Sequence, residues 1–216
     1  MRIIPDALRK AVLLALPLAG CAAAPGAARA SVPEPVANVR EVRADSGKVT
    51  EADIRFMSGM IGHHAQALVM AKMAPTHGAS PTIQTLCARI INAQRDEIAL
   101  MQQWLRDHKQ PAPTPEDALK MMDEMPAMMM PGMLSPTQMQ QLDAARGEDF
   151  DILFLKYMIQ HHTGATSMVK DLFATEGAAQ DDTVFKLASD VNVDQTTEIA
   201  RMQRMLYELL FGKEHQ

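Results

Sequence analysis

Residues 60–64 read Met-Ile-Gly-His-His, and residues 158–162 read Met-Ile-Gln-His-His. The offset of 98 residues that relates His63 to His161 also relates Asp53 to Asp151, Phe56 to Phe154, and Met70 to Met168. A second set of matches follows at an offset of 101 residues, in which Gln94, Glu97, Ile98 and Met101 correspond to Gln195, Glu198, Ile199 and Met202. The chain is therefore expected to contain one structural unit twice.

Apolar residues in both copies recur at the spacing of helices. We expect long helices at about residues 53–74, 82–108, 149–174 and 182–211, and short ones that begin near Thr114 and Ser135. No segment alternates polar and apolar residues as a half-buried strand would. These features predict an all-α fold, a four-helix bundle built from a duplicated helical hairpin. It would occupy a domain over residues 49–216, with a Met-rich central crossover over residues 109–147.

The first 48 residues carry targeting features. A basic start and a short apolar run indicate a signal peptide over residues 1–20, too short for a permanent membrane span. The run ends in Leu-Ala-Gly-Cys at residues 18–21, which resembles a bacterial lipobox and implies lipidation of Cys21. Cleavage after Ala30 is the second interpretation. Residues 21–48 are expected to form a flexible tether. Both interpretations predict export to the periplasm, and the first adds a membrane anchor.

The composition argues against several classes of function. A net charge of −5 gives no electrostatic footprint for binding nucleic acid. We expect no enzyme, because no nucleophile–base arrangement, phosphate-binding loop or dinucleotide fingerprint is present. Methionine is in excess, with 18 Met against 6 Phe, 2 Tyr and 1 Trp. Cys87 lies in an apolar helical pattern; a buried core residue is the expected role, and a soft-metal thiolate is the alternative.

The two histidine dyads indicate a metal site. Imidazole and thioether groups together are ligands of soft or borderline metals. On a helix that advances about 100° per residue, the dyad and its flanking methionines share one side. The expected ligands are Met60, His63, His64, Met70, Met158, His161, His162 and Met168. Either histidine of each dyad could be the one that binds.

The helices expected at about residues 82–108 and 182–211 each place a glutamate and a methionine on one face. Glu97 and Glu198 are expected to orient the imidazoles rather than to bind a soft metal directly. Met101 and Met202 lie on the same faces. The resulting hypothesis is an exported copper-binding protein that buffers Cu(I) or passes it to a copper-handling partner.

The crossover holds a second concentration of sulfur. Seven methionines lie within thirteen residues: Met121, Met122, Met125, Met128, Met129, Met130 and Met133. Prolines within this stretch prevent one continuous helix. Two interpretations stay open, an apolar flap that covers the bundle and a flexible loop that captures Cu(I).

These motifs resemble the bacterial family catalogued as domain of unknown function 305. The resemblance rests on residues 56–67, 94–98, 131–135, 150–154 and 158–165, and extends over about residues 50–212. It implies a ferritin-like four-helix bundle that is usually exported. Some members of the family are periplasmic copper-binding proteins linked to copper resistance, which implies copper ligands among the histidines and methionines named above.

Two other functions compete with copper binding. A ferritin-like di-iron or di-manganese enzyme would use the histidines with Glu97 and Glu198. Such sites normally place a glutamate three residues before a histidine, whereas Met60 and Met158 occupy those positions before His63 and His161. The other alternative is a metal-free structural or partner-binding bundle, in which the histidines form ordinary core hydrogen bonds.

Overall fold

The computed structural model describes residues 49–124 and 129–212, apart from the side chain of Asp123, and over these ranges the fold is all-α without strands. The helices are α1 (Glu51–Lys72), α2 (Pro81–Asp107), α3 (Pro115–Glu124), α4 (Pro136–Ala144), α5 (Gly147–Ala174) and α6 (Asp182–Phe211). The all-α prediction is confirmed. The expected signal peptide (1–20), Cys21, the tether (21–48), Met125 and Met128 lie outside the described residues. Within them, every helix is too short or too polar to cross a membrane.

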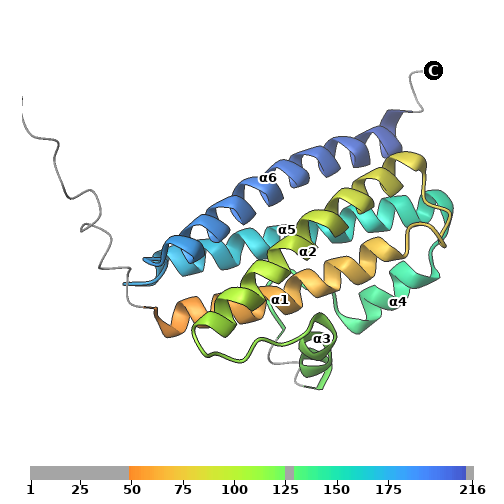
Figure 1. Ribbon diagram of the computed structural model, residues 1–216. Coiled ribbons are helices and arrows are strands. Elements are labelled where there is room, and N and C mark those ends of the chain that lie inside the picture. The colour runs from red at the N-terminus through yellow and green to blue at the C-terminus, as the bar shows by residue number, and fades with distance from the viewer. Residues whose placement is uncertain (1–48, 125–128, 213–216) are drawn as a thin grey trace, which may run out of the picture. The chain divides into compact units, whose positions relative to one another are not determined.

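Four long helices form two hairpins, as Figure 1 shows. Helix α1 packs along α2, α5 packs along α6, and the hairpins meet through α1 and α5. Helix α1 begins at Glu51, two residues before its expected start, because Thr50 and Asp53 cap each other's backbone N–H groups. Ser80 caps α2 in a similar way, and its hydroxyl accepts the Ile83 N–H. The short helices pack outside this framework, α3 against α1 and α4 against α5.

Two buried aspartates fasten each hairpin to the loop of the other. The Asp53 carboxylate of α1 accepts the Ala179 N–H at 2.7 Å, in the loop between α5 and α6. The Asp151 carboxylate of α5 accepts the Ser80 N–H at 3.2 Å, in the loop between α1 and α2. The start of each helix therefore lies near the end of the other, so α1 and α5 run antiparallel. The two repeats are thereby held in fixed register around their histidines.

The end of the crossover, residues 129–134, packs against α1 and α5 through two pairs of equivalent positions. At the first pair α1 has Gly62 and α5 has Gln160; at the second, α1 has Gln66 and α5 has Gly164. The glutamines hold the crossover backbone, since Gln66 makes two hydrogen bonds with Leu134 and Gln160 donates one to the Gly132 carbonyl.

The glycines provide space for the crossover. A Cβ at Gly164 would overlap the Pro131 carbonyl, and a Cβ at Gly62 would overlap the thioether of Met122. At Gly132 the backbone is left-handed, with φ of +79°, and its Cβ position is occupied by the backbone of α5. Each repeat thus has one glutamine that forms hydrogen bonds with the crossover and one glycine whose missing side chain allows close packing.

We predict that Gly164→Ala lowers the free energy of unfolding by about 1–3 kcal/mol, because the added methyl group overpacks a backbone-to-backbone contact. Urea denaturation of the variant and the parent measures the difference. Gly212→Ala is the control, since a Cβ there meets nothing within 4 Å. Equal stability of all three proteins would contradict the described contact between Gly164 and the Pro131–Gly132 turn.

Candidate metal centre

The four histidines of the two dyads form one buried cluster between α1 and α5. The rings of His63 and His161 lie at its centre, with centroids 3.8 Å apart. His64 and His162 flank this pair, each with its ring centroid 6.2–6.3 Å from that of its sequence neighbour. All four side chains are inaccessible to solvent. We refer to these residues as the histidine cluster.

Three members of the cluster direct an N–H group outward to an oxygen. His64 Nε2 donates to Glu97 Oε2 at 2.6 Å, and His162 Nε2 donates to Glu198 Oε2 at 2.7 Å. The repeat is therefore preserved in this pair of contacts. His63 Nε2 donates to the backbone carbonyl of Pro131 in the crossover, at 3.1 Å. In a neutral imidazole, such a bond leaves the lone pair on Nδ1.

The remaining polar atoms of this region have no hydrogen-bond partner among the described residues. They are Nδ1 of His63, His64 and His162, both ring nitrogens of His161, both amide atoms of Gln94, and Oε1 of Gln195. Gln94 and Gln195 are buried at equivalent positions of α2 and α6. Each unpartnered buried polar atom costs about 1–3 kcal/mol. Five of these atoms belong to the histidine cluster, which indicates a site whose partner is an external group.

Burial also keeps the central imidazoles neutral. Desolvation, reinforced by the neighbouring His64, lowers the pKa of His63 to about 3, although its bond to the Pro131 carbonyl opposes the shift. Desolvation, followed by the effect of His63, holds the pKa of His161 well below its usual value of 6.5. A neutral imidazole can donate a lone pair to a metal, whereas an imidazolium cannot. Burial therefore keeps the central pair in the neutral form, which is the form that a metal ligand requires.

The predicted methionine ligands divide between two hydrophobic clusters. One contains Met60, Met101 and Met168, and the other contains Met70, Met158 and Met202. The helical wheel grouped Met60 with Met70 beside one dyad. The antiparallel arrangement of α1 and α5 instead groups Met60 with Met168 and Met70 with Met158. Of these six methionines, each cluster receives one from α1, one from α5 and one from an outer helix, and all six are buried; Met57 of α1 also lies in the first cluster.

The methionines of the crossover are distributed over several environments. Met122 and Met133 are buried, Met129 and Met130 are partly buried, and Met121 is exposed. Pro131, which follows Met130, supplies the carbonyl that holds His63. This contact was not anticipated from the sequence, and its only trace there is the Pro-Gly pair that forms the turn.

Carboxylates and thiols do not complete a metal site in the described part of the chain. No three or more His, Cys, Asp and Glu side chains there are arranged to hold a metal ion. The carboxylates of Glu97 and Glu198 contact Nε2 of His64 and His162. Cys87 is buried, and desolvation raises the pKa of its thiol to about 12, in agreement with the core role. Metal binding would thus require the imidazole rings to turn or thioethers to participate.

Known proteins show the same fold. The family described as domain of unknown function (DUF305) matches residues 53–206. No curated protein sequence matches the chain significantly. A DUF305 protein of Streptomyces coelicolor, presumed to be secreted, superposes with a TM-score of 0.62 at 25% identity, over 73% of this chain and 93% of the other. A DUF305 fragment of Deinococcus radiodurans superposes with a TM-score of 0.59 at 29% identity, over 73% and 97%.

CopM is a further structural relative. Its Cu(I)-bound form superposes with a TM-score of 0.56 at 27% identity, over 74% of this chain and 97% of CopM. A Cu(II)-bound form is also known, with a TM-score of 0.55 at 28% identity, over 72% and 96%. The chain therefore has the all-α fold of proteins that include a copper binder.

We predict that the metal-free protein loses stability as the pH falls from 7 to 5. Burial lowers the pKa of His63 to about 3 in the folded state from its ordinary value of 6.5, so the unfolded state binds more protons between these pH values and stability rises with pH. This window corresponds to about 2 kcal/mol for His63 between pH 7 and 5. His161 acts in the same direction.

Denaturant titrations at the two pH values measure this effect. The His63→Gln/His161→Gln variant is the control, because it retains every other titratable group. Its stability is expected to change less between pH 7 and 5 than that of the parent. The same pH dependence in both proteins would show that the central imidazoles are not held neutral.

Proposed function

We propose, from the premise that this chain belongs to the DUF305 family, that it is an exported, non-enzymatic protein that binds copper as Cu(I) through the histidine cluster. Its expected ligands are His63, His64, His161 and His162. Met60, Met70, Met158 and Met168 lie in the flanking hydrophobic clusters, as do Met101 and Met202. They supply thioethers that could complete the coordination of a soft ion.

One observation carries the proposal. The Nε2 atoms of His63, His64 and His162 each bond to an oxygen, and their buried Nδ1 atoms have no hydrogen-bond partner in the described part of the chain. Neither ring nitrogen of the adjacent His161 has a side-chain hydrogen-bond partner among the described residues. Metal-binding histidines typically donate their other N–H to a carboxylate or a backbone carbonyl. Glu97 and Glu198 fill the first role and Pro131 fills the second. Copper would satisfy the atoms that the fold leaves unpaired.

The choice of a soft metal rests on two features of the site: imidazole and thioether groups are present, and the nearby carboxylates are not placed as direct ligands. The carboxylates of Glu97 and Glu198 face the distal nitrogens of the imidazoles. A di-iron or di-manganese centre would need carboxylates as direct ligands, whereas Glu97 and Glu198 are already bonded to imidazole N–H groups. The similarity to CopM, solved with Cu(I) and with Cu(II), supports copper. A metal-free bundle would leave the unpartnered atoms unexplained.

The biological setting follows from the sequence and the relatives. The signal peptide and the resemblance to a protein presumed to be secreted support export, and the lipobox supports a membrane anchor on Cys21. Buffering of Cu(I), or its transfer to a copper-handling partner in the periplasm, fits such a location. We further infer that the fold is a ferritin-like four-helix bundle whose two hairpins arose by duplication, since the reciprocal aspartate contacts relate them symmetrically.

We predict that the mature domain, loaded anaerobically with Cu(I) and desalted, retains copper, and that the His63→Gln/His161→Gln variant retains markedly less. These substitutions remove the central pair of imidazoles. Metal analysis of the desalted protein measures retention. His108→Gln is the control, because His108 bonds only locally to the Trp104 carbonyl. A parent protein that emerges without copper would refute the proposal.

We predict a smaller effect for the Glu97→Gln/Glu198→Gln variant, because an amide retains an acceptor for the imidazole N–H but loses the negative charge. Cu(I) affinity is expected to fall by about 10–100-fold. A competition titration with a chromogenic Cu(I) chelator measures it. Glu208→Gln on α6 is the control for the loss of charge. An unchanged affinity would exclude a role for these carboxylates in orienting the ligands.

A further inference from the structure

A second accumulation of thioethers lies outside the histidine cluster. A cavity of about 490 Å³ opens between α1, α3, α5 and the crossover. Four methionines from three separate segments line it: Met121 and Met122 of α3, Met130 of the crossover, and Met168 of α5. Its polar lining comes from Arg55, Ser58, Asp171 and Thr175. Histidine, cysteine and glutamate are absent from this lining, so its only soft donors are sulfur atoms.

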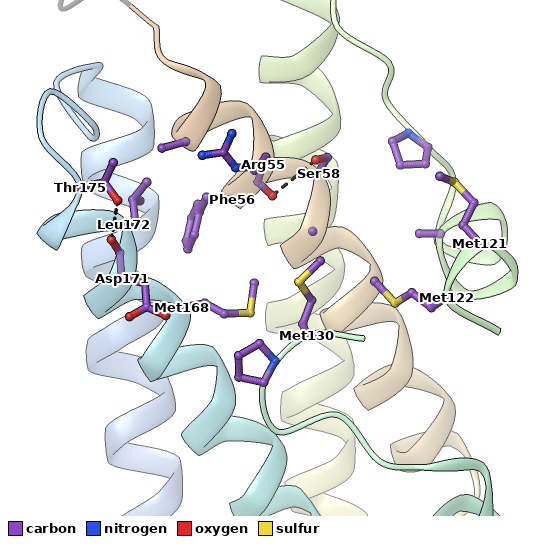
Figure 2. Close-up of a pocket in the computed structure, with 15 residues that line it drawn as sticks. Arg55, Phe56, Ser58, Met121, Met122, Met130, Met168, Asp171, Leu172 and Thr175 are labelled. Carbon is purple, nitrogen blue, oxygen red and sulfur yellow. Dashed lines mark hydrogen bonds between the residues drawn. The ribbon is translucent and has the colours of Figure 1, made fainter. Parts of the chain in front are cut away.

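Three of these thioethers extend toward one another across α1. Figure 2 shows Met168 reaching from one side and Met122 from the other, with Met130 between them. A Cβ added to Gly59 would lie 2.9 Å from Met130 Cε, 3.3 Å from Met130 Sδ and 3.9 Å from Met168 Cε. One helical turn further on, a Cβ added to Gly62 would lie 3.0 Å from Met122 Sδ. Because Gly59 and Gly62 have no side chains, the thioethers of Met130 and Met122 can pack directly against the backbone of α1.

The exposure of the methionines differs around the cavity. Met121 is 43% exposed, whereas Met122 and Met168 are only 7% and 8% exposed. An ion from solvent would therefore meet Met121 first and reach Met122 and Met168 on the inner wall of the cavity. Methionine is unbranched and has three rotatable bonds, so its sulfur can adjust to a bound ion at small cost.

We propose that Met122, Met130 and Met168 form a second soft-metal site, which takes a monovalent Cu(I) or Ag(I) ion independently of the histidine cluster. This inference rests on the proposed function for its metal. Thioethers are neutral and need no deprotonation, and their softness excludes competition from zinc or other harder divalent ions. Met168 lies in the same hydrophobic cluster as Met60 and also lines the cavity, so the outer site shares this residue with the thioethers proposed to flank the histidines.

The two sites share one structural element. Met130 lines the cavity, and the adjacent Pro131 accepts the hydrogen bond from His63. An ion held by Met130 would therefore be one residue away in the chain from the carbonyl that positions the central histidine. The outer site and the histidine cluster therefore contact neighbouring residues of the same crossover segment.

The test uses the mature domain with Ag(I), which has no accessible redox chemistry in this experiment. Variants are His63→Gln/His161→Gln, which removes the central histidines, and Met122→Leu/Met130→Leu/Met168→Leu, which removes the outer thioethers and keeps apolar volume. Met133→Leu is the matched control, because Met133 is a buried methionine of the same crossover that does not line the cavity. Native mass spectrometry counts the ions, and X-ray absorption at the silver edge identifies sulfur or nitrogen donors.

We expect the histidine variant to keep an Ag(I) ion with sulfur donors only, and the triple leucine variant to lose that ion while it keeps nitrogen coordination. Affinity at the outer site should fall at least about tenfold in the triple variant. Met130→Leu alone, at a partly buried position, gives the same direction if the triple variant unfolds. A histidine variant without sulfur-bound silver would overturn this inference. Absence of nitrogen-bound silver in the parent would instead refute the proposed function.

Discussion

The arrangement of the whole domain depends on the burial of four imidazoles between α1 and α5. Folded proteins pair more than nine in ten of their buried polar groups, yet here several adjacent atoms from both repeats stay unpaired among the described residues. The outward bonds to Glu97, Glu198 and Pro131 fix which nitrogen of each ring is left over. The fold thus tolerates an energetic cost where equivalent histidines of the two repeats, His63 and His161, are in contact.

The sequence repeat accounts for the matching contacts of this centre, and the single crossover accounts for the contacts that do not match. Equivalent glutamates hold His64 and His162, and equivalent aspartates hold the opposite loops. The crossover, however, occurs only once, so it must pack against two related helices in different ways. At one pair of equivalent positions the first repeat has glycine (Gly62) and the second has glutamine (Gln160). At the other pair the order is reversed, with Gln66 in the first repeat and Gly164 in the second. As a result His63 bonds to the carbonyl of Pro131 in the crossover, and no equivalent bond to the crossover is described for His161.

The sequence predicted the features that occur in both repeats, but it did not predict the contacts made by the single crossover. Helices with clear apolar spacing, the hairpin pairing and the burial of both dyads followed from periodicity and from the repeat. The regrouping of Met60 with Met168 could not be derived, because a helical wheel describes one helix and not the direction of its neighbour. The Pro131 contact and the methionine cavity depend on the path of the crossover across α1 and α5, which no local pattern specifies.

The imidazoles and the cavity thioethers differ in their access to solvent, so they would differ in how fast they exchange a bound ion. Imidazoles enclosed by helices exchange ions only when surrounding structure moves, whereas thioethers along an open cavity can exchange ligands with solvent or with an incoming protein. An ion that binds only the folded state also stabilises it in proportion to the logarithm of its concentration. Copper at the histidine cluster would then offset the cost of the unpaired polar atoms, and the same crossover that covers the cluster would limit the rate at which the ion is gained or released.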